Sequence, residues 1–157
     1  MIKIMFVCHG NICRSPMAEF IMKSKLRRAG ILDKAEIFSC ATSAEEIWRG
    51  VGNPMYPAAK AELTRNGVPF SERRAVQLRA DDYDKYDLFV GMDEANIRNM
   101  KRIFGADRKN KIRKLMDFTD KAGADVADPW YSDRFDITFR DIDAGCDGLI
   151  SHLGLLN

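Results

Sequence analysis

The chain has 157 residues with 46% hydrophobic and 31% charged side chains, which indicates one globular domain over residues 1–157 and excludes disordered and collagen-like proteins. Its 25 Lys and Arg against 23 Asp and Glu give a formal net charge of +2, so we expect no nucleic-acid partner. The apolar run at residues 4–8 is shorter than a membrane helix of roughly 20 residues or the apolar region of a signal peptide. We therefore expect no membrane partner and a cytoplasmic location.

The N-terminal part of the chain predicts a strand, a helix and a second strand. Residues 2–7 form a short apolar run that is typical of a buried strand. Residues 15–29 follow as a helix, because Ser15 suits the N-cap and Pro16 suits the first helical position. A second strand is expected at residues 36–39.

The rest of the chain continues this alternation. In chain order we predict a loop at 41–56, a helix at 57–65, a strand at 87–92, a helix between Asp93 and Gly105, an edge strand at 111–115 and a helix at 135–153. Such alternation predicts an α/β fold with three αβα layers around a four-stranded parallel sheet. Ligands in these folds bind at the carboxyl ends of the strands, which places the site in the loop between the first strand and the first helix.

The four cysteines are expected to be free thiols in a reducing compartment. Cys8 and Cys13 are the only close pair, and no second pair follows at a spacing that would complete a zinc site. We therefore expect no metal.

The loop after the first strand carries reactive side chains. Cys8 ends the strand, and Arg14 follows six positions later, just before the helix. Gly10 and Asn11 tolerate the left-handed backbone that a loop wrapped around a ligand needs. The amides of such a loop can bind an anion at the positive end of the helix dipole, and the Arg14 guanidinium matches two phosphate oxygens. The same amides and Arg14 favour a thiolate at Cys8, to which the Ser15 hydroxyl can donate. An anion site with a thiolate in it indicates phosphoryl transfer by a cysteine nucleophile.

Residues 7–16, Val-Cys-His-Gly-Asn-Ile-Cys-Arg-Ser-Pro, closely resemble the phosphate loop of the low-molecular-weight protein tyrosine phosphatases. The resemblance covers nearly the whole chain. Residues 39–43 resemble the exit of the family's second strand, residues 92–96 resemble the exit of its third strand, and Asp128-Pro129 resembles its acid loop. The resemblance implies an enzyme that hydrolyses phosphotyrosine in protein substrates through a phosphocysteine intermediate, without a metal or a cofactor.

The resemblance also implies roles for individual residues. Cys8 attacks the phosphorus, Arg14 holds phosphate oxygens, and Asp128 protonates the leaving phenolate and then activates water. Ser39 and Asp93 support the loop. Binding of the phosphate, or of another oxyanion, and of the phenyl ring is assigned to His9, Gly10, Asn11, Ile12, Cys13, Ser15, Trp48, Trp130 and Tyr131.

Three alternative functions stay open at this point. Ile12 stands where related arginine phosphatases tend to carry threonine, which favours phosphotyrosine over phosphoarginine. A phosphate-binding module without activity would lack Cys8, Arg14 or Asp128, and all three are present. A redox protein that uses Cys8 and Cys13 would turn over a disulfide without releasing phosphate.

Arg73 and Cys13 raise two further expectations. Arg73 stands where many relatives place a histidine that supports the loop through residues matching Asn11 and Ser39, and we expect its charge to be solvated. The family precedent implies that Cys13 forms a reversible disulfide with Cys8 and so protects the nucleophile from irreversible oxidation.

Overall fold

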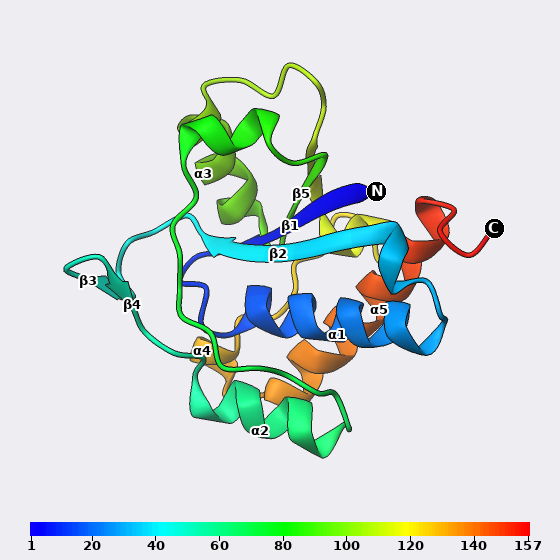
Figure 1. Ribbon diagram of the computed structural model, residues 1–157. Helices are drawn as coiled ribbons and strands as arrows, with labels where there is room; N and C mark the ends of the chain where they lie inside the picture. Colours follow the sequence, from blue (N-terminus) through cyan, green and yellow to red (C-terminus); the bar gives the residue numbers. More distant parts are fainter.

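A computed structural model describes all residues from 1 to 157 (Figure 1). Four parallel strands form one sheet in the order β2-β1-β5-β6, with bounds β1 Ile2–Cys8, β2 Ala35–Ala41, β5 Leu88–Gly91 and β6 Ile112–Lys114. The helices α1 (Arg14–Arg28), α2 (Pro57–Arg65) and α5 (Phe135–His152) lie on one side of the sheet, and α3 (Glu94–Phe104) lies on the other. The predicted three-layer fold with a four-stranded parallel sheet is confirmed.

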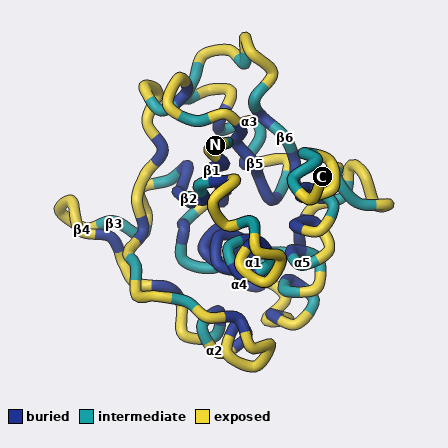
Figure 2. The backbone as a smooth tube through the Cα atoms, turned by 45° about the vertical axis from the view of Figure 1, so that its right-hand side comes forward, coloured by how far each residue is buried: buried dark blue, intermediate teal, exposed yellow.

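Strand β1 divides the core into two parts. Ile4 and Phe6 belong to the larger cluster, which is shared with α1 and α5, whereas Met5 and Val7 belong to the smaller cluster on the α3 side. All four side chains are at most 4% exposed. Because both faces of the sheet are covered, this central strand is apolar on both sides. Figure 2 shows that much of α1 is buried.

The turn between β5 and α3 is fixed by a capping box. The Asp93 carboxylate accepts a hydrogen bond from the backbone amide of Asn96 at 2.8 Å. In return, the side-chain oxygen Oδ1 of Asn96 accepts from the backbone amides of Asp93 and Met92. This confirms the predicted cap at Asp93. The turn lies at the carboxyl end of the strand next to β1.

Helix α5 packs closely against the 3-10 helix η3 (Leu115–Phe118), which follows β6 directly. A Cβ atom at Gly145 would lie 2.4 Å from the Leu115 side chain, and one at Gly148 would lie 1.9 Å from the Phe118 carbonyl oxygen. Only glycine permits this approach. None of the helices combines the length and the apolar character that a membrane span requires.

The structure corrects three local predictions. Helix α1 begins at Arg14, and Ser15 does not cap it, because the Ser15 hydroxyl contacts Cys8 instead. The predicted loop at 41–56 contains a hairpin of β3 (Ile47–Trp48) and β4 (Val51–Gly52). The segment after Asp128 is the short helix α4 (Pro129–Ser132), in which the Asp128 carboxylate caps the Trp130 amide.

Three short elements were not predicted, namely the 3-10 helices η1 (Leu32–Lys34), η2 (Ala80–Asp84) and η3. Asp107 joins η2 to the entry of β6. Its carboxylate accepts hydrogen bonds from the Tyr83 hydroxyl at 2.6 Å and from the amides of Lys111 and Ile112 at 2.8 and 3.1 Å. Burial opposes the charge, but these donors outweigh burial and lower the pKa of Asp107 below its ordinary value.

We predict that Asp107→Ala lowers the free energy of unfolding by roughly 1–3 kcal/mol near pH 7, because three donors lose a charged acceptor. The pKa of Asp107 is lowered in the folded protein, so its stabilisation is complete above the ordinary carboxyl pKa and fades as pH falls through the folded value. Urea unfolding of both proteins near pH 7 and near pH 3 tests this. An equal difference in stability at the two pH values would contradict it.

Candidate active site

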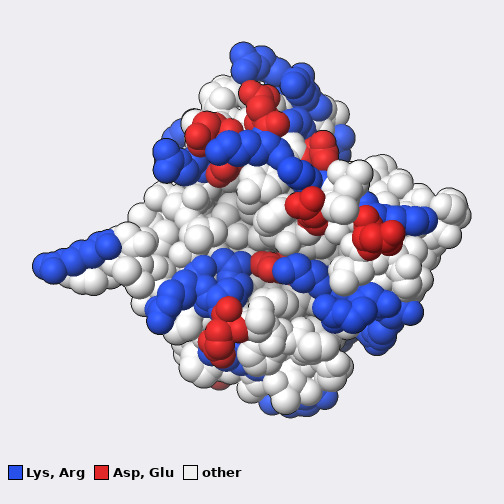
Figure 3. Space-filling model, in the orientation of Figure 1, with Lys and Arg blue, Asp and Glu red and all other residues white.

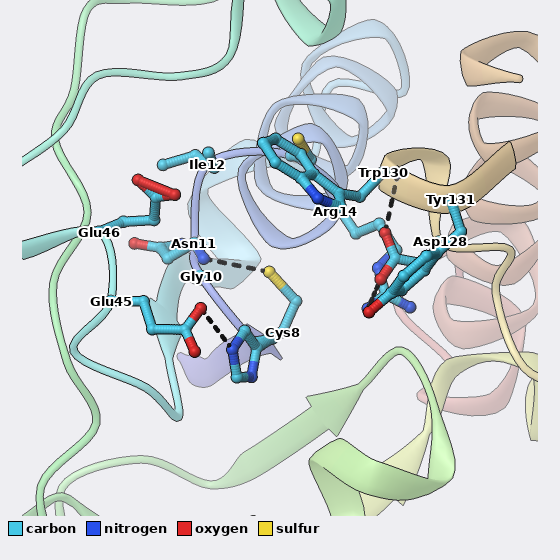
Figure 4. A pocket seen from close by; sticks show the side chains of 12 residues that line it. Cys8, Gly10, Asn11, Ile12, Arg14, Glu45, Glu46, Asp128, Trp130 and Tyr131 are labelled. Carbon is cyan, nitrogen blue, oxygen red and sulfur yellow. Dashed lines mark hydrogen bonds and ion pairs between the residues drawn. The ribbon is translucent and has the colours of Figure 1, made fainter. Parts of the chain in front are cut away.

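A pocket of about 450 Å³ opens at the carboxyl end of β1 (Figure 4). Three separate parts of the chain form it: the loop after β1, the segment after β2 and the start of α4. The lining consists of residues 8–14, Glu45, Glu46, Asp128, Trp130 and Tyr131. Most residues predicted for the site therefore line one cavity, whereas Ser15, Ser39, Trp48 and Asp93 do not.

The Cys8 side chain is a buried group of this pocket, with 4% exposure. Its sulfur lies 3.0 Å from the Ser15 hydroxyl and accepts hydrogen bonds from the amides of Asn11 and Ser15 at 3.3 and 3.4 Å. One backbone donor from the loop and one from the first turn of α1 are therefore directed at the same sulfur atom. This arrangement suits a thiolate, because a thiolate accepts hydrogen bonds and cannot donate one.

Asn11 shapes the loop around this sulfur. Its φ is 60°, the left-handed conformation that its sequence position predicted. The Asn11 amide group donates to the hydroxyls of Ser15 and Ser39 at 2.8 and 3.1 Å, which holds the loop in place. Gly10 does not adopt a left-handed backbone. A Cβ atom there would lie 3.2 Å from the Glu46 side chain, a tight contact from which that side chain would have to move by a few tenths of an ångström.

Arg14 is 3% exposed and is held from three directions. Its guanidinium lies 2.9 Å from the Asp93 carboxylate and 3.6 Å from the Asp128 carboxylate, and it donates to the Val126 carbonyl at 3.0 Å. Burial opposes the charge, but Cys8 and the two carboxylates outweigh burial and raise the pKa of Arg14. A permanent cation therefore lies between the sulfur and the predicted acid.

Two of the three predicted aromatic residues line the pocket. Trp130 and Tyr131 are 62% and 87% exposed, and the Trp130 ring packs edge to face on Tyr56 at 5.6 Å. Trp48 does not reach the pocket. It is 73% exposed on the β3–β4 hairpin, which projects away from the body of the molecule (Figures 1 and 3).

Comparison with known proteins identifies the family. The model of the family "Low molecular weight phosphotyrosine protein phosphatase" matches residues 3–155. The chain belongs to this family. It is 33% identical to the low molecular weight protein-tyrosine-phosphatase YfkJ of Bacillus subtilis over 154 residues, which cover 98% of this chain and 96% of the relative. It is 35% identical to PtpA of Staphylococcus saprophyticus over 153 residues, or 98% of this chain and 94% of the relative.

The crystal structure of YfkJ superimposes on this member of the family with a TM-score of 0.90 at 32% identity, covering 98% of this chain and 95% of the other. A structure of SP-PTP, a low molecular weight protein tyrosine phosphatase from Streptococcus pyogenes, gives a TM-score of 0.84 at 34% identity and covers 98% and 93%. The resemblance expected from the loop and strand-exit motifs is confirmed over nearly the whole chain.

Arg73 is not solvated in this low-molecular-weight phosphatase. The side chain is only 15% exposed, and its guanidinium donates to the Glu19 carboxylate at 2.7 Å, to the Ser39 hydroxyl and to the side-chain oxygen Oδ1 of Asn11. Ser39 also donates to Glu19 at 2.6 Å. A planar guanidinium can reach these partners together, and this explains why the expectation of a surface charge was wrong.

Sequence reasoning missed three residues of the site. Glu45 and Glu46 lie two and three residues after the strand exit at residues 39–43, and this closeness to the motif was the signal that could have found them. Glu19 was not singled out as a site residue. Its place among apolar positions of α1 was the sign that it is buried, and it is 8% exposed.

We predict that Arg73→Met weakens anion binding, because Asn11 and Ser39 lose the donor that fixes them against Glu19. The rise in Tm on adding inorganic phosphate should become smaller, and the free energy of unfolding should fall by about 1.5–3 kcal/mol. The exposed Arg28→Met serves as the control. A phosphate-induced rise in Tm that is equal in Arg73→Met and in the native protein would contradict the prediction.

Proposed function

We propose that this chain hydrolyses phosphotyrosine in protein substrates through a phosphocysteine intermediate. The observation that supports it most is the meeting of Cys8, Arg14 and Asp128 around one pocket, although Asp128 lies far from the other two in sequence. Family membership supports the same reaction.

In the first step the Cys8 thiolate attacks phosphorus, and the bond from phosphorus to the tyrosine oxygen breaks. Asp128 in its protonated form gives its proton to that oxygen, so that tyrosine leaves as a neutral phenol. The amides of the loop and the Arg14 guanidinium stabilise the charge on the phosphoryl oxygens. These groups supply the positive charge from the chain itself, and no step of this mechanism calls for a metal or cofactor.

In the second step water attacks the phosphorus of phosphocysteine and the P–S bond breaks. The Asp128 carboxylate accepts a proton from this water, which restores the acid for the next cycle. The Cys8 thiolate is released together with inorganic phosphate. We therefore infer that inorganic phosphate and similar oxyanions also bind in the loop.

The shape of the pocket favours an aryl phosphate. Cys8 is buried, whereas Trp130 and Tyr131 lie exposed at the opening (Figure 4). A phenyl ring can span this depth and pack on the aromatic side chains, while the short side chain of phosphoserine would leave its phosphate far from the sulfur. A nucleophilic thiol has to stay reduced, so we further propose a reducing compartment such as the cytoplasm.

We predict that the native protein releases phosphate from phosphotyrosine peptides in EDTA and that Cys8→Ser abolishes this release. Cys146→Ala, which alters a buried thiol of α5 outside the pocket, should retain activity. The assay compares phosphotyrosine and phosphoarginine peptides of the same sequence. Release mainly from phosphoarginine would overturn the proposed substrate but keep the nucleophile. Binding of phosphate without release from either peptide would indicate a binding module.

Cys13 lines the same pocket as Cys8. Burial, together with the charges of Cys8 and Asp128, raises the pKa of Cys13 to about 12, so it remains a thiol at neutral pH. Peroxide converts Cys8 to a sulfenic acid. The Cys13 sulfur can then displace its oxygen as water and form a disulfide, which two equivalents of added thiol reduce.

We predict that thiol restores most of the activity of the native protein after peroxide treatment, whereas Cys13→Ser recovers little. Without Cys13, the sulfenic acid of Cys8 is open to further oxidation, which thiols do not reverse. Activity after dithiothreitol, measured against peroxide dose, tests this prediction. Equal recovery of the two proteins would reject a protective role for Cys13.

A further inference from the structure

The residues just before Asp128 are held by hydrogen bonds to other elements of the fold. Asp125 is the first of them. Its carboxylate accepts a hydrogen bond from the Lys114 ammonium at 2.6 Å and from the Glu94 amide at 3.1 Å. Lys114 also donates to the Gly123 carbonyl at 3.0 Å. One side chain at the end of β6 therefore binds this loop at two points.

The next two residues are also fixed. The Val126 amide donates to the Met92 carbonyl at 2.8 Å, and the Val126 carbonyl accepts from Arg14. The Ala127 carbonyl accepts a hydrogen bond from the Thr138 hydroxyl of α5 at 2.9 Å. Two of the side chains that hydrogen-bond to this loop, those of Lys114 and Thr138, lie outside the pocket.

Both side chains are buried polar groups. Thr138 is 0% exposed and Lys114 is 8% exposed. Burial opposes the charge of Lys114, but the hydrogen bond to Asp125 and the nearby carboxylates outweigh burial and raise the pKa of Lys114. The carboxylates that pair with Lys114 are more than half exposed, at 52% for Asp125 and 59% for Glu94, and ion pairs that solvent screens in this way add little to stability. Positioning of the loop therefore explains a lysine at this position better than a gain in stability does.

Lys114 and Thr138 therefore both hydrogen-bond to the segment of the chain that leads directly into Asp128. The carboxylate of Asp128 is then oriented by the Trp130 amide at 3.0 Å and faces Arg14. A general acid has to lie within hydrogen-bond reach of the leaving oxygen, and a displacement of about 1 Å can cost on the order of 100-fold in rate. Small movements of residues 125–127 would therefore affect proton transfer.

We propose that Lys114 and Thr138 are positioning residues for Asp128, which they hold ready to protonate the leaving group before the substrate binds. This inference rests on the proposed phosphatase reaction. Neither residue touches the substrate. Each acts through the loop backbone, Lys114 through Asp125 and Thr138 through Ala127.

The test compares two substrates that differ in their need for an acid. Phenyl phosphate releases a phenol with a pKa of about 10 and depends on protonation. The phenol of 2,4-dinitrophenyl phosphate is acidic enough to leave as an anion. In Lys114→Met and in Thr138→Val, we expect kcat/KM for phenyl phosphate to fall by about 10- to 100-fold and kcat/KM for the dinitrophenyl ester to stay within about twofold.

Three controls separate positioning from a structural role. The ratio of the two kcat/KM values does not depend on the folded fraction, so partial unfolding cannot produce a selective loss. Thr138→Ser keeps the hydroxyl and should restore the native ratio. Lys25→Met removes another lysine that binds two carboxylates, at 2.8 and 2.9 Å between α1 and α5, and should leave the ratio unchanged.

A double-mutant comparison completes the design. If Lys114 and Thr138 act only through Asp128, neither substitution should lower activity further in an Asp128→Asn background. An equal loss with both substrates, an unchanged ratio, or a full additional loss in the Asp128→Asn background would overturn the positioning role of the residue concerned. No turnover of either substrate by the native protein would instead refute the proposed function itself.

Discussion

The buried guanidinium of Arg14 is the group on which the rest of the site depends. With 3% exposure, such a charge is tolerable only if carboxylates and carbonyls surround it. Asp93 at the end of β5 and the Val126 carbonyl of the acid loop provide these partners. Because one side chain needs partners from both segments, it also fixes where the loop after β1 lies relative to the acid loop.

The order of the strands makes this meeting possible. β1 lies between β2 and β5, so the segments that follow all three strands start at one edge of the sheet. The segment after β2 supplies the two glutamates on one side of the pocket, and α4 supplies the aromatic side chains on the other (Figure 4). Beneath the loop, the pair of Glu19 and Arg73 keeps Asn11 and Ser39 in place on the side away from the opening.

The parts of the fold that could be predicted are those that depend on local sequence. The apolar run of β1, the cap at Asp93 and the periodic pattern of α5 each carry their own signal, and each was found close to its real bounds. The motif at residues 7–16 likewise located Cys8 and Arg14, because the loop and the helix that follows it are contiguous in the chain.

What could not be predicted depends on partners distant in sequence. Ser15 has the sequence of an N-cap, but its hydroxyl is engaged by the sulfur that the loop brings over the helix. Arg73 looks like a surface charge, yet its partners Asn11 and Glu19 lie more than fifty residues away. Trp48 follows the motif of the second strand, but a short hairpin turn through Arg49 and Gly50, both with positive φ, carries it outward.

The two glycines of α5 affect the pocket through the packing of α5 against η3. Gly145 and Gly148 let α5 approach η3, and η3 begins at the residue after Lys114. Thr138 lies on the same helix two turns earlier, so one helix contact sets the separation of the two side chains that hold the acid loop. A methyl group at Gly145, which does not line the pocket, would push this contact apart. The identity of these two residues therefore bears on the position of residues 125–127 as well as on the packing of α5.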